Sequence, residues 1–367
     1  MLLEVVRIRH SSLIIHNWRT AVVIAIALLG ATAPAASADD YAVLVYPCAR
    51  AAQAPVIDGV LDEPAWQQAT LVSGFTYYDK PELAPVQTSF RVVYDDRALY
   101  LGVICAEPAL AGLQLTRPPR DSLEIFQGEC VEIFVDPRHD HQRYFQFGIG
   151  VGGSLYDSED YDSGHWNSAA QATAHRGVGE WSVELAIPWD DLGVEPRPGR
   201  VLGFNVARDR YLGPAREWSN WSQTDSNFHD APRFAHLVLS ASPAQMGQLA
   251  DEFRKGGRTG PVRIFSTQGF TGKTYRALAQ AALAEVEGVV SQTAGAAAGD
   301  ASPDVAAEIR KGLEPFQARA EKLRHRLGAG PLEAAAWVAL DRDSAGLLRD
   351  LRALLWQSRL NALLASI

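Results

Sequence analysis

The sequence lacks the short motifs that mark many catalytic and metal centres. Its 367 residues contain no G-x-S-x-G or H-E-x-x-H motif and no phosphate-binding glycine loop of the P-loop type. Cysteine is scarce, at Cys48, Cys105 and Cys130, and neither a C-x-x-C pair nor a histidine cluster predicts zinc. One disulfide with a spare thiol and three free cysteines remain open alternatives, because spacing cannot choose a pair.

Excess positive charge and a long apolar run are also missing. The net charge is −9, which argues against a nucleic-acid partner, because phosphate contact needs clustered Lys and Arg. The run AVVIAIALLGATAPA is short for a membrane span, follows Arg7, Arg9 and Arg19, and precedes a small-residue cleavage site. We therefore expect a signal peptide over residues 1–38 and a secreted or periplasmic protein; an uncleaved anchor helix is the alternative.

Alternating apolar and polar residues dominate positions 56–240 and predict strands. The runs are TSFRVVYD, ALYLGVICA, CVEIFVD, RYFQFGIGV, WSVELAIPW, LGFNVARDRY and FAHLVL. Helical periodicity is nearly absent there, apart from a short helix that Asp62 would cap, with Pro64 in its first turn. Short strands without intervening helices predict a mainly β fold, an antiparallel β-sandwich of jelly-roll type, over residues 39–242.

Residues 243–367 change to an Ala, Leu, Arg and Glu composition that predicts α-helices. Helical patterns cover TYRALAQAALAEVEGVV, the stretch from Ser302, its expected N-cap, to Leu327, and the last residues from Ser344. A flexible linker is expected near 294–303. The helices are expected to pack on one another as a small bundle, or to dock on a protein partner.

Glu132 is out of place in its strand, because it sits among Val131, Ile133 and Val135. Alternation puts it on the opposite sheet face. Gln146 and several glycines share the corresponding face of the strand YFQFGIGVGG, and glycine in a strand often marks the approach of a ligand. A covered carboxylate needs partners, which paired sugar hydroxyls can supply. A salt bridge to Arg91, Arg143 or Arg208 is the structural alternative.

Aromatic residues in the predicted loops could supply stacking surfaces for flat sugar faces. Core positions are expected for Trp66, Trp181 and Trp189 from their capping, strand and turn contexts. The loop aromatics are Phe126, Tyr161, Trp166, Trp218, Trp221 and Phe228.

Eight motifs follow one another along the chain: VIDGVLDEPAW, VVYDDRALYLGVIC, ECVEIFVDP, YFQFGIG, WSVELAIPW, GFNVARDR, WSNWS and NFHDAPRFAHLVL. In this order they resemble carbohydrate-binding modules of family 9 and their relatives, from about Val56 to Leu239. The resemblance implies a non-catalytic β-sandwich that holds a sugar between two aromatic platforms.

Position by position, the resemblance implies a carbohydrate-binding role for Glu132 and Gln146, and puts Phe126 and Phe228 where the family has stacking tryptophans. Asp225 falls at a ligand-binding asparagine of the family, and Gly148 replaces a strand arginine. From the loop aromatics we add Trp166 to this set.

The resemblance also raises two cofactors. Family members bind calcium, and YDSEDYD offers four acidic side chains as candidate ligands, although a solvated acidic loop is the alternative. Some related sandwiches hold haem through methionine, but Met1 and Met246 both lie outside the sandwich, so a haem carrier is not expected.

Two other functions stay open. The first is glycoside hydrolysis by a pair of carboxyl groups, Glu132 with Asp136 or Glu184. A related alternative is that the chain is the non-catalytic portion of a larger glycoside hydrolase. The second is a structural adaptor with a degenerate sandwich, which Gly148 favours. We expect no catalytic residues in this chain.

Overall fold

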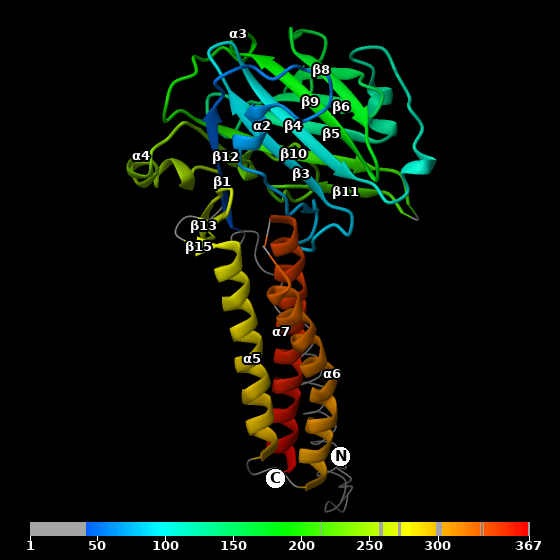
Figure 1. Cartoon of the computed structure of the whole chain (residues 1–367), viewed down its shortest axis with the longest axis vertical. Coiled ribbons are helices and arrows are strands. Elements are labelled where there is room, and N and C mark those ends of the chain that lie inside the picture. The colour runs from blue at the N-terminus through cyan, green and yellow to red at the C-terminus, as the bar shows by residue number, and fades with distance from the viewer. Residues whose placement is uncertain are drawn as a thin grey trace, which may run out of the picture.

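The computed structural model has a β-sandwich head and a stalk of three long helices (Figure 1). It describes residues 42–213, 215–256, 260–270, 273–298, 303–330, 332 and 334–365. The expected signal peptide and the N-cap Ser302 lie outside the described residues.

The strands of the head form one hydrogen-bonded path that folds into two faces. The path runs β7-β6-β5-β10-β12-β1-β3-β4-β9-β8, with β11, β2 and β13 attached beside it. The bounds are β1 Val43–Arg50, β2 Thr76–Tyr77, β3 Thr88–Tyr94, β4 Ala98–Ala106, β5 Cys130–Asp136, β6 Phe145–Gly150, β7 Leu155–Glu159, β8 Gln171–Arg176, β9 Glu180–Pro188, β10 Val201–Arg210, β11 Glu217–Asn220, β12 Ala235–Leu239 and β13 Val262–Ile264. All seven predicted strands are present, and the sandwich prediction is confirmed.

Strand β1 was not predicted, and it joins the two faces of the sandwich. Its first part pairs with β12 and its last two residues, Ala49 and Arg50, pair with β3. Both pairings are parallel, unlike the antiparallel pairings elsewhere in the head, except that β13 also runs parallel to β1. Apolar packing continues past residue 242, because Met246 and Phe253 contact Val43 and Val238.

The core between the two faces contains the side chains that alternation assigned to it. Val131, Ile133 and Val135 of β5 are buried there, and Glu132 and Phe134 point to the outer face. The short helix α2 (Pro64–Gln68) is present with Trp66 buried, as predicted, but its N-cap is Glu63 rather than Asp62, and no side chain caps it. Trp181 and Trp189 are also buried as expected, and all three cysteines are buried and free.

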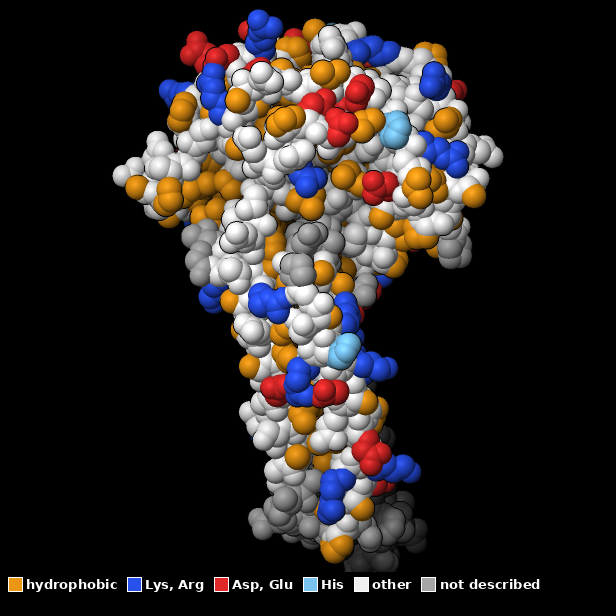
Figure 2. All heavy atoms as spheres, in the orientation of Figure 1, with side chains coloured by type: hydrophobic (Ala, Val, Ile, Leu, Met, Phe, Trp, Pro, Cys, Tyr) orange, Lys and Arg blue, Asp and Glu red, His pale blue; other side chains and the backbone are white. Residues whose placement is uncertain are grey.

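The stalk consists of α5 (Tyr275–Ala298), α6 (Pro303–Gly328) and α7 (Ala334–Ala365), which share one apolar core. The linker expected near 294–303 is wrong in part, because α5 continues to residue 298. Charged side chains line the stalk surface in Figure 2, and ion pairs join its helices, as between Arg324 and Glu287. The helices therefore pack on one another; docking to a protein partner stays a prediction.

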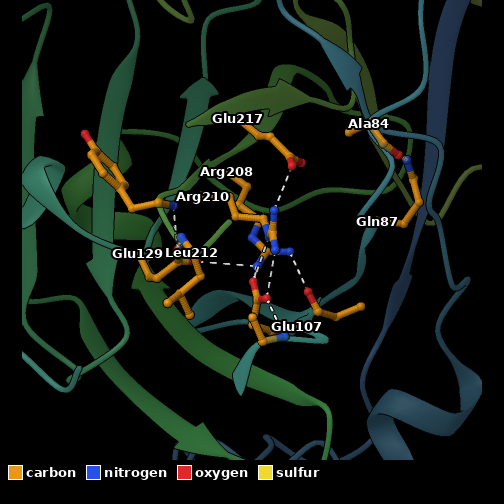
Figure 3. Close-up of polar contacts among 11 residues, drawn as sticks. Ala84, Gln87, Glu107, Glu129, Arg208, Arg210, Leu212 and Glu217 are labelled. Atoms are coloured by element: carbon orange, nitrogen blue, oxygen red, sulfur yellow. Dashed lines mark hydrogen bonds and ion pairs between the residues drawn. The ribbon is translucent and has the colours of Figure 1, made fainter. Parts of the chain in front are cut away.

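A network of buried charges ties β10 to the loops at one end of the sandwich (Figure 3). Glu107 accepts hydrogen bonds from Arg208 (3.0 Å) and from Arg210 (2.7 and 2.9 Å). Arg210 also donates to Glu217, and Glu129 lies 3.5 Å from Arg208. Burial opposes ionisation of Glu107, but the hydrogen bonds from Arg210 and the Ala109 amide outweigh it and lower its pKa. Glu107 therefore stays ionised although its side chain is out of water.

We predict that Glu107→Gln lowers the free energy of unfolding by about 3 kcal/mol, because it removes a charge partner that two buried guanidinium groups share. Urea denaturation measures this loss. The control is Asp96→Asn, which breaks the exposed pair with Arg50 and should cost much less, because water screens an exposed ion pair. Equal effects of the two substitutions would contradict a structural role for the network.

Candidate functional site

A pocket of about 580 Å³ lies on the outer face of the head, with Glu132 of β5, Gln146 of β6 and Asp209 of β10 among its lining residues. These three strands are adjacent, so alternate side chains from each reach the same face. The pocket is lined by Tyr78, Leu123, Phe126, Glu132, Gln146, Tyr156, Tyr161, Asp209, Trp218, Ser226, Asn227, Phe228 and His229. Its volume is in the range of small-molecule sites.

The polar floor of the pocket is a chain of hydrogen bonds. Ser158 donates to the Gln146 carbonyl over 3.2 Å, and Gln146 donates to Glu132. Asp209 of β10 lies on the side of β5 opposite β6, and its Oδ1 is buried without a hydrogen-bond partner. A proton on either carboxyl group lets Glu132 and Asp209 hydrogen-bond each other. The chain holds Glu132 between an amide and a second carboxyl group.

The two carboxyl groups cannot both be ionised without strong repulsion. Burial raises the pKa of Glu132 from 4.5 to about 7, against the lowering effect of the hydrogen bonds from Gln146 and Asp209. Burial, reinforced by the charge of Glu132, raises the pKa of Asp209 well above its ordinary value. The pair therefore keeps a shared proton up to about neutral pH, and it can both donate and accept hydrogen bonds.

None of the three arginines considered as salt-bridge partners holds Glu132. Arg208, for example, points into the charge network and contacts Glu107 and Glu129. The alternative carboxyl partners are also placed elsewhere. Asp136 accepts from the amides of Arg138 and His141, and Glu184 lies on β9, where it accepts from Trp66.

Phe126 reaches the pocket from a short 3-10 helix, η3 (Leu123–Gln127), whose N-cap Ser122 accepts from the Glu124 amide. Its ring packs directly over Gly148: a Cβ at position 148 would lie 2.8 Å from the ring. The ring also meets Tyr156 edge-on at 5.0 Å between centroids. The observed position of the Phe126 ring thus depends on glycine at 148, because any side chain at 148 would displace the ring.

Phe228 lines the pocket but is mostly buried, with 7% of its surface exposed. It packs in a cluster with Phe134, Tyr144 and Phe234. The ring therefore supports the wall and leaves little free face for a ligand, in contrast to the platform that the sequence suggested.

The exposed rings stand at the two edges of the pocket. Tyr161 follows edge strand β7 and has 62% of its surface exposed, and Trp218 on β11 has 37% exposed. The strand order puts β6, β5 and β10 between these two edges. His229 stacks on Tyr161 with a centroid distance of 3.9 Å, and Tyr144 hydrogen-bonds His229. Tyr161 is thereby held in a fixed orientation.

Two predicted site residues do not reach this pocket. Trp166 packs against Phe145 at 4.4 Å, beside the inter-sheet core. Asp225 forms an ion pair with Arg233 over 3.3 Å. Glu132, Gln146, Phe126 and Phe228 are brought together, and ligand roles for all six remain predictions.

The acidic stretch considered for calcium is partly a strand. Asp157 lies on β7, fully buried, and pairs with Arg120 and the Ser168 amide, whereas Asp162 bonds His165. Within the described residues, no three acidic side chains converge there. Calcium binding therefore stays a prediction that the donor set does not support.

Sequence reasoning missed Asp209, although a signal was present. Asp209 alternates with Ala207 and Asn205 in a predicted strand, so period-2 spacing gives these residues one face. What the sequence could not give is the pairing of β10 with β5, in which Ala207 lies opposite Glu132.

Comparison with known proteins agrees with this geometry. Residues 57–242 match the family described as "Carbohydrate family 9 binding domain-like". The chain belongs to this family of carbohydrate-binding domains. The family resemblance inferred from the sequence motifs is confirmed.

Curated relatives include two bacterial enzymes. Endo-1,4-beta-xylanase A of Thermoanaerobacterium saccharolyticum is 24% identical over 222 residues, covering 58% of this chain and 18% of that protein. Endo-1,4-beta-xylanase A of Thermotoga maritima is 28% identical over 193 residues, covering 50% and 17%. The chain thus spans less than a fifth of the length of each of these relatives.

Among solved structures, a family 9 carbohydrate-binding module from Caldicellulosiruptor kristjanssonii in complex with cellotriose is 19% identical. The match covers 54% of this chain and 94% of that one, with a TM-score of 0.42. No helix within the described part of the chain has both the length and the apolar character that a membrane span requires.

The raised pKa values generate a prediction about stability. A carboxyl group whose pKa is higher in the folded state stabilises the fold at low pH and loses that contribution as pH rises through its pKa. Between pH 4 and pH 8 the raised pKa of Glu132 alone should therefore cost the wild type about 3 kcal/mol, at about 1.4 kcal/mol per pKa unit, and the raised pKa of Asp209 adds to this loss. The Glu132→Gln, Asp209→Asn double variant should lack this loss.

Denaturant titrations of both proteins across this pH range measure the difference. The double variant supplies the control for other titrating groups, such as Glu184, whose pKa burial also raises to about 7. Parallel pH profiles for the two proteins would show that the pair does not share a proton.

Proposed function

We propose that the pocket binds a carbohydrate without chemically changing it. The observation that carries this proposal is the combination of a hydrogen-bonding floor, Glu132, Gln146 and Asp209, with exposed rings at both edges. Sugar hydroxyls both donate and accept, which matches a carboxyl pair that shares a proton. Sugar C–H faces match the rings of Tyr161 and Trp218.

The carboxyl pair is poorly arranged for glycoside hydrolysis. A retaining enzyme places two carboxyl groups about 5–5.5 Å apart on either side of the bond, and an inverting enzyme places them further apart. Glu132 and Asp209 instead hydrogen-bond each other on one floor. This supports a binding domain, and turnover of polysaccharide by the purified protein would contradict it.

The position of the exposed rings bears on the kind of sugar. Four strand spacings separate β7 from β11, about 19 Å across the sheet. That spacing belongs to the strands, and the ring of Tyr161 turns back onto His229 of the same pocket. We infer that the site takes a short β-1,4-linked oligosaccharide, because a relative is named endo-1,4-beta-xylanase A.

We also infer export for this chain. The support is the expected signal peptide over residues 1–38 together with the family of sugar-binding domains, whose polymeric ligands lie outside cells. N-terminal sequencing of the protein recovered from a secreting host tests this inference. An intact N-terminus in the soluble fraction of the cytoplasm would contradict it.

We predict that Trp218→Ala and Tyr161→Ala each weaken oligosaccharide binding about fivefold to tenfold, because each removes one stacking ring worth about 1 kcal/mol. Isothermal titration calorimetry with glucose, cellotriose and xylo-oligosaccharides measures the affinity. The matched control is Trp356→Ala, which removes a ring as exposed as that of Tyr161 from α7 of the stalk and should leave the affinity unchanged.

Failure of the wild type to bind any sugar of this panel would favour the alternative, a structural adaptor with a degenerate sandwich. If Trp218→Ala and Tyr161→Ala both bind sugar with the affinity of the wild type, as the control does, the sugar binds away from these two rings.

A further inference from the structure

Three histidines gather at a second place in the head, where no metal-binding motif is recognisable from residue spacing. His139 and His141 follow β5, and His236 lies on β12, 97 residues further on. All three are buried, with at most 5% of their surface exposed. Their ring centroids are 4.8, 4.9 and 5.5 Å apart.

Each ring turns one nitrogen outward to an acceptor. His139 Nδ1 lies 3.0 Å from a Glu252 oxygen, and His141 Nδ1 lies 3.0 Å from the Ala231 carbonyl oxygen. His236 Nε2 lies 3.2 Å from the Phe253 carbonyl oxygen. Carboxylates and backbone carbonyls in these positions are what fix the tautomer of metal-bound histidines.

The other three nitrogens face one another. His139 Nε2 lies 2.8 Å from His236 Nδ1, and His141 Nε2 is buried without a hydrogen-bond partner. One ligand atom from each ring lies within 4.8 Å of the other two. No fourth His, Cys, Asp or Glu joins the group within the described residues.

Neutral rings cannot satisfy this arrangement. A neutral imidazole has one N–H and one bare nitrogen. The series from Glu252 through His139 and His236 to the Phe253 carbonyl begins and ends on an acceptor, so its two outer nitrogens must both carry protons. The two inner nitrogens, 2.8 Å apart, are then both bare and repel each other.

An extra proton between the two rings would relieve this repulsion, but it would put a charged imidazolium among rings that are at most 5% exposed. Lys255 lies 2.7 Å from the Glu252 oxygen that His139 contacts, so this carboxylate is already paired. A divalent cation at the centre removes the conflict, since it uses all three inner lone pairs and leaves all three outer N–H groups bonded.

The backbone around the cluster is also unusual. His139 and His141 have φ angles of 53° and 57°, in the left-handed region that residues with a Cβ rarely adopt. Gly256, with φ of 83°, lets its own backbone lie against the cluster, because a Cβ there would lie 2.1 Å from the Pro232 carbonyl oxygen and 3.1 Å from His141 Nδ1. Strained residues of this kind concentrate at functional sites.

We propose that His139 Nε2, His141 Nε2 and His236 Nδ1 bind one zinc-class divalent metal ion, which clamps the segment 252–256 onto the sandwich. Three imidazoles suit zinc and leave its fourth position to a non-protein ligand. Zn–N bonds of about 2.0–2.1 Å place tetrahedral ligand atoms about 3.3 Å apart. The pair at 2.8 Å would open slightly, and any pair near 4.8 Å would close.

Zinc titration of tag-free, chelator-treated protein by calorimetry tests the site. We expect one equivalent to bind the wild type, and His141→Ala to weaken binding more than about 100-fold, because loss of a ligand exceeds the about 10- to 100-fold cost of losing an outer partner. Glu252→Ala should fall within that smaller range. The matched control His175→Ala removes an exposed histidine of β8 and should bind as the wild type does.

Two further measurements distinguish this site from adventitious zinc. Cobalt should give the visible absorption of a four-coordinate ion in the wild type only, and zinc should raise the melting temperature by several degrees in the wild type but not in His141→Ala. Equal zinc affinity in all four proteins, or no binding by folded wild type at 0.1 mM zinc, would overturn the proposal. Glu252→Ala keeps the three ligands, so it serves if His141→Ala fails to fold.

Discussion

The alternation of charged side chains at the end of β10 is the constraint on which the head depends. Arg208 and Arg210 face the loops and bind Glu107, whereas Asp209 between them faces the pocket and bonds Glu132. A shift of one residue in the pairing of β10 would exchange these two sets. It would leave two guanidinium groups on the pocket floor and a carboxylate against Glu107. The buried ion pairs thus fix the register that the pocket needs.

The same register explains why the pocket floor is a carboxyl pair rather than a salt bridge. Both arginines at this end of β10 bind carboxylates on the loop side, and among the described residues no arginine or lysine forms an ion pair with Glu132. The proton that Glu132 and Asp209 share then reduces the negative charge of the pocket floor, as a bound cation would in a salt bridge. Such a floor favours uncharged ligands with hydroxyl groups. Gly148 completes the arrangement, because a Cβ at that position would lie 2.8 Å from the ring of Phe126.

The sequence predicted well what depends on local alternation and poorly what depends on pairing between distant segments. The inward and outward faces of β5 and β6 followed from period-2 spacing alone. Strand β7 was interpreted as an acidic loop, because nothing in YDSEDYD indicates that Arg120 neutralises the buried Asp157. Tyr161 and Trp218 were recognised as loop aromatics, but their exposure became apparent only once β7 and β11 were placed at opposite edges. The histidine cluster was missed for the same reason: His236 meets His139 only through the fold.

The candidate sugar site and the candidate metal site both contain buried polar groups that repel each other, carboxyl groups in the first and imidazole rings in the second. Both bury polar groups whose hydrogen bonds do not balance: two carboxyl groups need one proton between them, and three imidazoles have lone pairs that meet without one. Carboxyl oxygens on an open floor can exchange that proton with water or with sugar hydroxyls at little cost. Imidazole nitrogens that meet each other have no such donor beside them, so a bound cation is the stable answer there. Because β5 carries Glu132 at its centre and leads into His139 at its end, a metal that fixes the end of β5 would also hold the floor of the pocket in register.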